Sequence, residues 1–313
     1  MAERRRIQTE LSTRRSSWAP RRLGWRLSGD HWYTAGILTK SVLWVCSPHL
    51  RWAQRPGRQR NRGARRLNSR TEAAVITGSS ALLCNPAFSA VSDDWLDPEF
   101  WGERASPVAS GGRGGAWYIS ASAGEFVLRQ YLRGGLVARL SRASYVFTGF
   151  DNTRSLREFR LLQQLRALGL PVPEPVAALA RRRGLLLWQG AILVCRIPGA
   201  RPLPESSALD EDDLWVRVGR LVRDFHDAGL DHADLNCDNI LEAGGALWLI
   251  DFDRCRLHPG SAPVAGWKKS NLRRLRRSVA KRCRALSPGR QEQLWRQLLQ
   301  GYETAARRAG SPP

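Results

Sequence analysis

The sequence predicts an α+β fold in which a small, sheet-rich part is followed by a mainly helical part. Short strand-like runs bounded by turn residues predict the first part, and amphipathic periodicity in residues 210–226 and 268–284 predicts the second. The chain has 313 residues, 42% of them hydrophobic, which is enough for a sizeable core. The six cysteines form no C-x-x-C pair, so we expect neither a structural zinc site nor a disulfide framework.

Residues 1–70 differ in composition from the rest of the chain. They carry 17 Lys and Arg but three acidic residues, within a chain whose net charge is +22, and their tryptophans follow no regular period. We predict a disordered basic extension. A tail without function is favoured, and the alternative is an arm that binds nucleic acid through phosphate contacts and stacking. We expect no secretory signal and no membrane-spanning segment, because the apolar runs are too short or too polar.

The first predicted domain, residues 71–200, contains a glycine-rich turn between short strands. The turn covers residues 110–115, and strands are expected at residues 116–120 and 125–131. Glycines allow backbone N–H groups to approach phosphate oxygens, although most glycine pairs belong to ordinary turns.

The same domain is expected to contain one long helix. Residues 155–168 place apolar side chains on one face, and Gly169 stands where a helix usually ends. Residues 185–188 and 191–195 predict a buried hairpin, and residues 93–101 an acidic, aromatic surface segment.

The second predicted domain, residues 201–313, contains a constellation that indicates phosphoryl transfer. The sequence His232-Ala-Asp234 is followed by Asn239, five residues after the aspartate, and an apolar strand then ends in Asp251-Phe252. Phosphoryl transfer needs one carboxylate to orient or accept the proton of the attacking hydroxyl, and oxygen ligands to hold Mg²⁺ on the ATP phosphates. The pattern H-x-D-x-x-x-x-N predicts Asp234 as the base, with Asn239 and Asp251 as metal ligands.

Several segments resemble the lipopolysaccharide core kinases, and among them the group that phosphorylates 3-deoxy-D-manno-octulosonic acid (Kdo). The resemblance covers roughly residues 95–285 and rests on the segments HDAGLDHADLN (226–236), DFDR (251–254), VLRQYLRGGL (127–136), IPGAR (197–201) and WKKSNLRRLRRS (267–278). It implies a protein-kinase-like fold with two lobes and the use of ATP and Mg²⁺.

The resemblance also implies roles for residues outside the catalytic loop. Gly112 and Gly114 would lie over the ATP phosphates, and Arg129 would take the place of the usual phosphate-binding lysine, with Glu158 as its partner on the helix. An alternative for Glu158 is a capping box with Ser155, and an alternative for Arg129 is a surface strand arginine. Asp253 replaces the glycine of D-F-G, which suggests that this loop does not flip. We expect structural roles for His226 and His232.

The acceptor is expected to be small or lipid-linked, because only about 15 residues separate Asp251 from Trp267. No acidic residue occurs from Arg254 to Gln291, and residues 268–284 hold nine Lys and Arg around an apolar stripe. This helix could lie on an anionic membrane or bind a phosphorylated acceptor, and the alternative is a solvated helix packed by its leucines.

The resemblance favours a Kdo–lipid A precursor as substrate, with the 4-hydroxyl of Kdo as acceptor, and a peripheral location at the cytoplasmic face of the bacterial inner membrane. The alternatives are a kinase for another small sugar or an aminoglycoside, and a basic nucleic-acid-binding protein. With the favoured function we expect an anionic membrane surface as partner, no nucleic acid and no obligate protein partner.

Overall fold

The computed structural model describes residues 73–88, 90–108, 115–131, 145–146, 149–183, 187–258 and 266–310. The predicted basic extension, residues 1–70, lies outside them.

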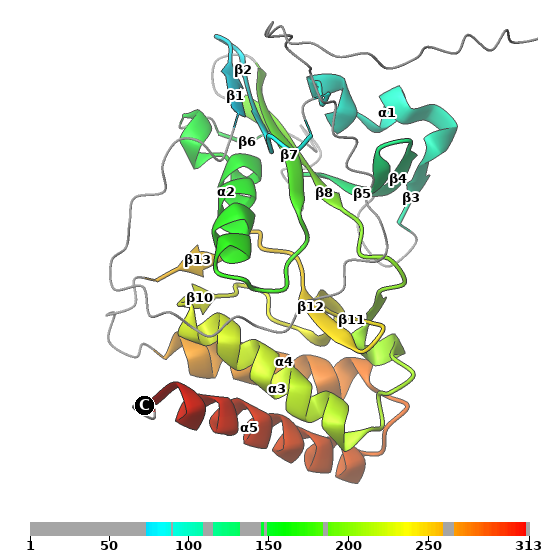
Figure 1. Cartoon of the computed structure of the whole chain (residues 1–313), viewed down its shortest axis with the longest axis vertical. Helices are drawn as coiled ribbons and strands as arrows, with labels where there is room; N and C mark the ends of the chain where they lie inside the picture. Colours follow the sequence, from blue (N-terminus) through cyan, green and yellow to red (C-terminus); the bar gives the residue numbers. More distant parts are fainter. Residues whose placement is uncertain are drawn as a thin grey trace, which may run out of the picture. The chain divides into compact units, whose positions relative to one another are not determined.

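One antiparallel sheet dominates the described residues before position 196 (Figure 1). In spatial order its strands are β1 (Ala73–Ile76), β2 (Ser80–Cys84), β7 (Pro175–Arg183), β8 (Leu187–Cys195), β5 (Gly124–Gln130), β4 (Ala116–Ala121) and β3 (Ala105–Pro107), and β6 (Tyr145–Val146) pairs with β8. The strands predicted at residues 116–120 and 125–131 are therefore confirmed.

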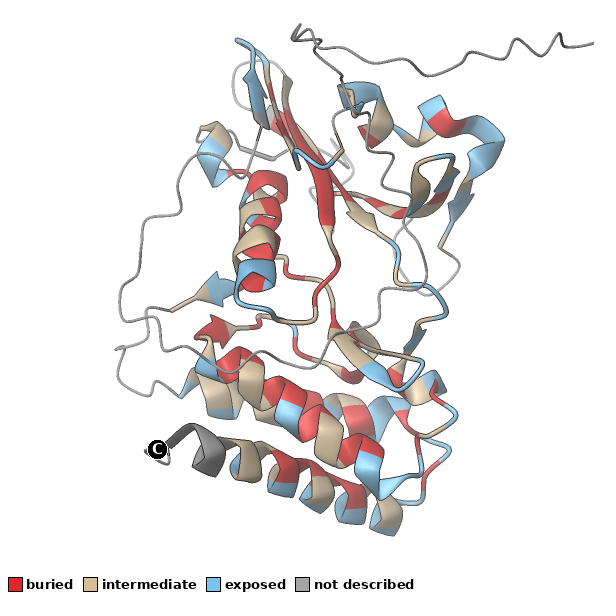
Figure 2. Ribbon diagram, in the orientation of Figure 1, coloured by how far each residue is buried: buried red, intermediate tan, exposed pale blue. Residues whose placement is uncertain are grey.

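Each face of this sheet packs against a different apolar cluster. Helix α2 (Arg154–Ala167), the predicted long helix, buries Phe159 in the same cluster as Ile192 of β8. The next residue of that strand, Leu193, belongs to the other cluster with Trp101 of α1 (Pro98–Trp101), because neighbouring strand residues point to opposite faces. The segment predicted at the surface, residues 93–101, exposes its acidic side chains, such as Asp93 and Glu99, but its Trp101 is only 3% exposed. Figure 2 shows buried residues along β7 and on one side of α2.

The predicted hairpin of residues 185–188 and 191–195 is wrong. Residues 187–195 form the single strand β8, whose hairpin partner is β7. Gly190 lies inside the strand rather than in a turn, and a Cβ atom there would be 2.7 Å from the hydroxyl oxygen of Ser155 on α2. The glycine therefore allows α2 to approach the sheet closely, which a strand-by-strand interpretation of the sequence does not reveal.

Three long helices and two small sheets form the remaining described part. The helices are α3 (Asp212–Asp227), α4 (Trp267–Arg282) and α5 (Pro288–Gly310), and the strands are β9 (Arg201–Pro202), β11 (Ile240–Ala243) and β12 (Ala246–Leu249) in one sheet, with β10 (Leu230–Asp231) and β13 (Arg256–Leu257) in the other. Short 3₁₀ helices cover Asp93–Leu96, Gly102–Arg104, Phe150–Asn152, Leu203–Glu205 and Cys237–Asn239. The predicted order, a sheet-rich lobe followed by a mainly helical lobe, is confirmed.

Helix α4 packs its apolar stripe inside the protein. Leu275 is fully buried and Val279 is 2% exposed, whereas Leu272 is half-buried, so most of the stripe packs inside the protein. The side of α4 that faces solvent is basic, with exposed Lys269, Arg273 and Arg277. None of the helices in the described ranges is both long and apolar enough to cross a bilayer.

Candidate active site

The segment before Asp234 is fixed by buried contacts. His232 is 1% exposed, its Nε2 lies 3.1 Å from the carbonyl oxygen of Ile250, and its backbone N–H donates to Oδ1 of Asn271 on α4 at 3.0 Å. Burial lowers the pKa of His232, which favours the neutral ring. This histidine therefore positions the loop, in agreement with the structural role predicted for it.

Asn236 organises the loop between Asp234 and Asn239. Its Oδ1 accepts hydrogen bonds from the backbone N–H groups of Asp238 and Asn239, at 2.9 and 3.1 Å. Its Nδ2 and that of Asn239 both donate to the carbonyl oxygen of Asp234, at 3.1 and 3.0 Å. Sequence reasoning missed Asn236, although asparagine is a favoured residue at the start of a helical turn and the signal was available.

The carboxylate of Asp234 is left open by these contacts. Asp234 is exposed, and no side chain or backbone group of the described residues bonds to its carboxylate oxygens. The surrounding hydrogen bonds hold its backbone rather than its side chain. Such a carboxylate can receive a proton from a hydroxyl that is brought to it.

Asn239 comes directly before β11 and Asp251 follows two residues after β12, so the pairing of these strands brings the two segments together. The backbone N–H of Ile250 donates to the carbonyl oxygen of Asn239 at 3.0 Å, which extends the pairing of β11 with β12. The side-chain amide of Asn239 is held by its nitrogen, so its Oδ1 remains available as a ligand. One carboxylate and one amide oxygen form a hard donor set that fits Mg²⁺, which completes its coordination with water and phosphate.

Arg129 joins its predicted partner Glu158 and the predicted metal ligand Asp251 in one ion-pair chain. Its Nη1 lies 3.0 Å from Oε1 of Glu158, and its Nη2 lies 2.7 Å from Oδ1 of Asp251. Burial would lower the pKa of Arg129, but the charges of Glu158 and Asp251 outweigh it and raise this pKa further. The predicted Arg129–Glu158 contact is present, and the alternative of a solvated strand arginine is excluded.

The capping-box alternative for Glu158 is also excluded. Helix α2 begins at Arg154 after Thr153, and no side chain caps its first turn. The hydroxyl of Ser155 donates instead to the carbonyl oxygen of Leu179 on β7, at 2.8 Å. Glu158 is 4% exposed and points to Arg129.

Tyr131 is a further member of this cluster that sequence reasoning missed. Its hydroxyl donates to Oε2 of Glu158, and its ring is 5% exposed. Burial, followed by the charge of Glu158, raises the pKa of Tyr131 well above its ordinary value, so it stays a neutral donor. No local pattern marks such a tyrosine, because its partner is contributed by a different element.

Five of the seven predicted site residues are thus described, and contacts connect them. Arg129, Glu158 and Asp251 form the ion-pair chain. The backbone N–H of Ile250, the neighbour of Asp251, bonds to the carbonyl oxygen of Asn239, and the side chain of Asn239 bonds to the carbonyl oxygen of Asp234. Gly112 and Gly114 lie outside the described residues.

Comparisons with known proteins identify the family of the chain. Residues 98–302 match the model of the lipopolysaccharide kinase (Kdo/WaaP) family. A protein of Stenotrophomonas maltophilia (strain R551-3), named 3-deoxy-D-manno-octulosonic acid kinase, is 48% identical over 190 residues, which are 60% of this chain and 75% of that protein. A protein of the same name from Xanthomonas axonopodis pv. citri is 49% identical over 188 residues, 59% of this chain and 74% of that protein.

Two solved structures are more distant. WaaP in complex with acyl carrier protein is 14% identical with a TM-score of 0.44, covering 74% of this chain and 99% of that chain. An aminoglycoside-3'-phosphotransferase of type VIII is 17% identical with a TM-score of 0.45, covering 67% of this chain and 89% of that chain. The family model spans most of the described residues and includes every contact of the ion-pair chain, and the chain therefore belongs to the lipopolysaccharide kinase (Kdo/WaaP) family.

Proposed function

We propose that this protein is an ATP-dependent kinase that phosphorylates Kdo on a Kdo–lipid A precursor during synthesis of the lipopolysaccharide core. The observation that carries the proposal is the connection of Asp234, Asn239 and Asp251 with the Arg129–Glu158 pair. The family membership and the name shared by relatives 48–49% identical to this chain support the choice of Kdo as acceptor.

Each residue of the site has a distinct task in this proposal. Asp234 orients the acceptor hydroxyl and takes its proton, while Arg129, held by Glu158, binds phosphate oxygens of ATP. Asn239 and Asp251 hold Mg²⁺, which when bound neutralises charge on the phosphates. We also propose phosphate contacts through backbone N–H groups at Gly112 and Gly114, which lie outside the described residues.

A kinase assay with defined acceptors tests the proposal. Purified protein is incubated with ATP, Mg²⁺ and a lipid A precursor that carries Kdo, and mass spectrometry detects the added phosphate. NMR of the product is expected to place it on the 4-hydroxyl of Kdo. Free small sugars and an aminoglycoside serve as competing acceptors, and turnover of one of these without phosphorylated lipid would overturn the choice of acceptor.

We further propose that the protein binds peripherally to the anionic cytoplasmic face of the inner membrane through the basic side of α4. A groove of about 400 Å³ lies between α4 and α5, lined by Gly266, Lys269, Leu272, Arg273, Arg276, Trp295 and Leu299. Arg276 pairs with Glu292 at 2.6 Å, whereas Lys269 and Arg273 contact no carboxylate of the described residues. Cations without partners beside half-buried apolar side chains are suited to anionic lipid headgroups.

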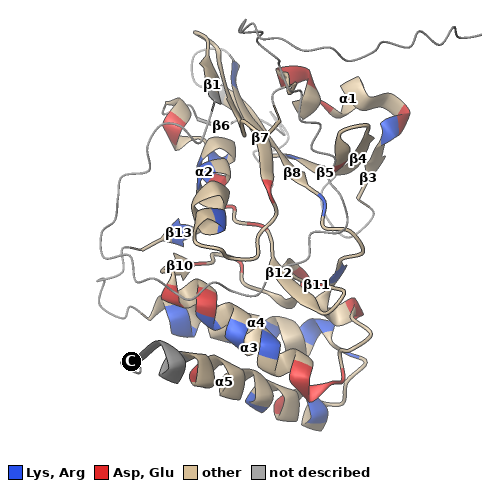
Figure 3. Cartoon of the chain, in the orientation of Figure 1, with Lys and Arg blue, Asp and Glu red and all other residues tan. Residues whose placement is uncertain are grey.

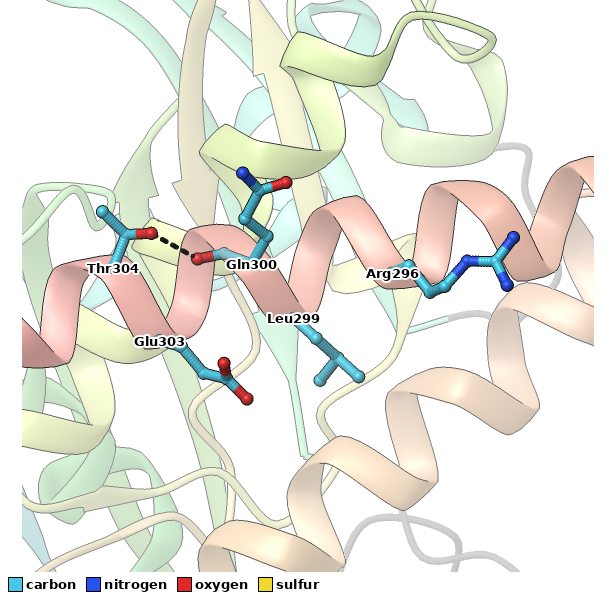
Figure 4. A pocket seen from close by; sticks show the side chains of 5 residues that line it. All are labelled: Arg296, Leu299, Gln300, Glu303 and Thr304. Atoms are coloured by element: carbon cyan, nitrogen blue, oxygen red, sulfur yellow. Dashed lines mark hydrogen bonds between the residues drawn. The ribbon is translucent and has the colours of Figure 1, made fainter.

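The charges around this groove are not evenly spread. Leu299 also borders a second pocket on α5, whose lining includes the acidic Glu303 (Figure 4). Basic residues are mixed with acidic ones on the helices of this part (Figure 3), but α4 itself carries no acidic residue. The α4 side of the groove is therefore the surface we assign to the membrane.

Vesicle binding tests this surface. The double reversal Lys269→Glu and Arg273→Glu should weaken binding to phosphatidylglycerol vesicles by more than tenfold, because each basic residue at such a surface contributes about 1 kcal/mol. A matched double reversal, Arg104→Glu and Arg220→Glu, changes the net charge equally at exposed positions outside α4. Equal losses in both double variants would contradict a specific surface, and binding should fall as salt rises.

The same reasoning proposes a division of the chain into three parts. Residues 1–70 form the basic extension, residues 71–200 a lobe that contacts the nucleotide, and residues 201–313 a lobe that carries the catalytic and metal-binding loops. The division is supported by the sheets, since no strand before residue 196 pairs with one after residue 200 among the described residues.

A further inference from the structure

Two residues of α2 are linked to the loop that follows β12, one directly and one through Arg129. Arg154 and Glu158 are four positions apart, so they lie on the same side of the helix. Glu158 reaches the loop through Arg129, which bonds to Asp251. Arg154 reaches it directly, because its Nε donates to Oδ1 of Asp253 at 2.6 Å and its Nη2 pairs with Oδ2 of the same carboxylate. Two links therefore join α2 to residues 251–253.

The buried Tyr131 packs these two links together. The guanidinium carbon of Arg129 lies 5.9 Å from the centre of the Tyr131 ring, and that of Arg154 lies 5.4 Å from it. The hydroxyl of the same tyrosine donates to Glu158. Both guanidinium groups thus lie near one ring.

The loop that Asp253 holds has an unfavourable backbone conformation. Asp251 has a φ of 63° and Arg254 a φ of 61°, in the left-handed region that residues with a Cβ atom rarely adopt. Such conformations persist where the surroundings fix them. Phe252 is 2% exposed and anchors one side of the loop, and the two-pronged bond from Arg154 to Asp253 anchors the other.

Under the proposed function, ligands compete with the Arg129–Asp251 link but not with the Arg154–Asp253 link. Under the proposed function, Arg129 binds phosphate and Asp251 binds metal, so the 2.7 Å bond between them competes with the ligands. Arg154 and Asp253 have no such second task. Their side chains are 24% and 16% exposed, so this pair is partly shielded from water. A glycine at position 253, as in the D-F-G pattern, could not form the pair.

We propose that Arg154 and Asp253 form a clamp that keeps Asp251 in the metal-binding position. The clamp holds when the Arg129–Asp251 bond breaks, so that Arg129 can bind the nucleotide and Asp251 can bind the metal. Arg154 and Asp253 are both positioning residues, and neither touches the substrates. The inference rests on the proposed function for the tasks of Arg129 and Asp251. Its consequence is that metal affinity, rather than acceptor affinity, depends on the clamp.

Charge-removing variants of nearly unchanged size test the clamp. Arg154→Gln, Asp253→Asn and the double variant are compared with the full-length protein. Each single variant should raise the Mg²⁺ concentration needed for half-maximal ATP binding by at least about tenfold, within the range of coupling measured for contacting residues. The double variant should lose no more than either single one. Arg160→Gln is the matched control, because Arg160 lies on α2 and pairs with Asp151 of the preceding 3₁₀ helix, whose side chain is 86% exposed.

Further readouts separate positioning from general stability. Backbone amides of residues 251–254 should exchange hydrogen faster in the single variants, whereas the KM for the acceptor should stay unchanged. The reciprocal variant Arg154→Asp with Asp253→Arg should recover part of the Mg²⁺ affinity, and Arg154→Lys, which keeps the charge but not the two-pronged bond, should lie between wild type and Arg154→Gln.

Three results would overturn the clamp: unchanged Mg²⁺ dependence in folded single variants, additive losses in the double variant, or equal losses in Arg160→Gln. If a glutamine or asparagine variant fails to fold, Arg154→Lys and the reciprocal variant decide by the same measurement. ATP binding needs no acceptor, so failure of the wild-type protein to phosphorylate Kdo would overturn the proposed function without affecting the test of the clamp.

Discussion

Asp234, the proposed proton acceptor, has an exposed carboxylate, whereas its backbone is fixed by hydrogen bonds. Asp234 keeps its side chain open while Asn236 and Asn239 bond to its carbonyl oxygen. Because these bonds fix the main chain, a change of the side chain alone should leave the loop in place. Catalysis can therefore be separated from nucleotide binding at this residue.

Asp234→Asn should lower kcat by at least about a hundredfold, the usual contribution of a positioned acid or base. ATP affinity should be unchanged, because the carboxylate contacts neither Arg129 nor Asp251 among the described residues. Steady-state kinetics and calorimetric titration with ATP measure the two quantities. Near-normal turnover would remove Asp234 from the mechanism.

The metal ligands should differ in strength. Asp251→Ala should weaken Mg²⁺-dependent ATP binding more than Asn239→Ala, because a carboxylate neutralises charge and an amide does not. Titration with ATP at several Mg²⁺ concentrations, with EDTA as the metal-free reference, measures the difference. Equal and mild effects of both substitutions would contradict the assignment.

His226 makes stability depend on pH. Its Nδ1 lies 2.8 Å from the hydroxyl of Tyr302, and burial, aided by Lys268, lowers its pKa from 6.5 to about 4. As pH falls from 6.5 towards 4, the His226 ring is therefore protonated in the unfolded chain but stays neutral in the folded protein. The free energy of unfolding is therefore unaffected above about pH 6.5. It decreases as pH falls below this value, by roughly 2 kcal/mol between pH 7 and pH 5.

Replacement of this histidine tests the sign of the effect. His226→Gln should be less stable than wild type at pH 7.5, because packing against Trp267 and Tyr302 is lost. The gap between the two unfolding free energies should narrow as pH falls to 5. Denaturant unfolding at both pH values measures it, and a constant gap would show that another group causes the acid sensitivity.

At the scale of elements, α3 and α5 pack with unusually close backbones. A Cβ atom on Gly219 of α3 would collide with the carbonyl oxygen of Leu298, and one on Gly301 of α5 would collide with that of Val216. Glycine inside a helix normally costs about 1 kcal/mol relative to alanine, so this contact must outweigh that cost. The pair sets the spacing of the helices beneath the catalytic loop.

Gly219→Ala should therefore destabilise the protein by about 1–3 kcal/mol, as overpacking does. The matched control is Gly289→Ala near the start of α5, where a Cβ atom meets nothing within 4 Å. That variant should be neutral or slightly stabilising. Thermal unfolding of the two variants measures the contrast, and similar Tm values would show that the helices can separate without cost.

At the scale of the whole molecule, every described residue that makes a contact in the site lies after position 115 in the chain. The family match begins at residue 98, and β1 begins at Ala73. Residues 1–70 contribute a large share of the positive charge without a predicted element. We expect them to be dispensable for catalysis.

A variant that begins at residue 71 should keep the kcat, the ATP affinity and the Tm of the full chain. Its binding to phosphatidylglycerol vesicles should persist through α4. Side-by-side kinase and vesicle assays of both proteins decide this. Loss of vesicle binding on truncation, together with no effect of the Lys269 and Arg273 reversals, would assign the membrane contact to the extension.

The sequence by itself determined the chemistry-bearing residues that are close together in the chain. Asp234 and Asn239 are five positions apart, and Asp251 follows an apolar strand, so local spacing was sufficient to propose all three as site residues. Helices α2, α3 and α4 and strands β4 and β5 were also predicted, because the period of apolar residues reflects the surface that each element buries.

Only the tertiary structure decided which distant residues meet. Glu158 had two possible partners in the sequence, and the packing of α2 on the sheet selected Arg129 over the capping box. Gly190 was misread as a turn because its close neighbour, Ser155, belongs to another element. Asp253 and Arg154 are 99 positions apart, so their pairing follows from the meeting of two elements and not from any local pattern.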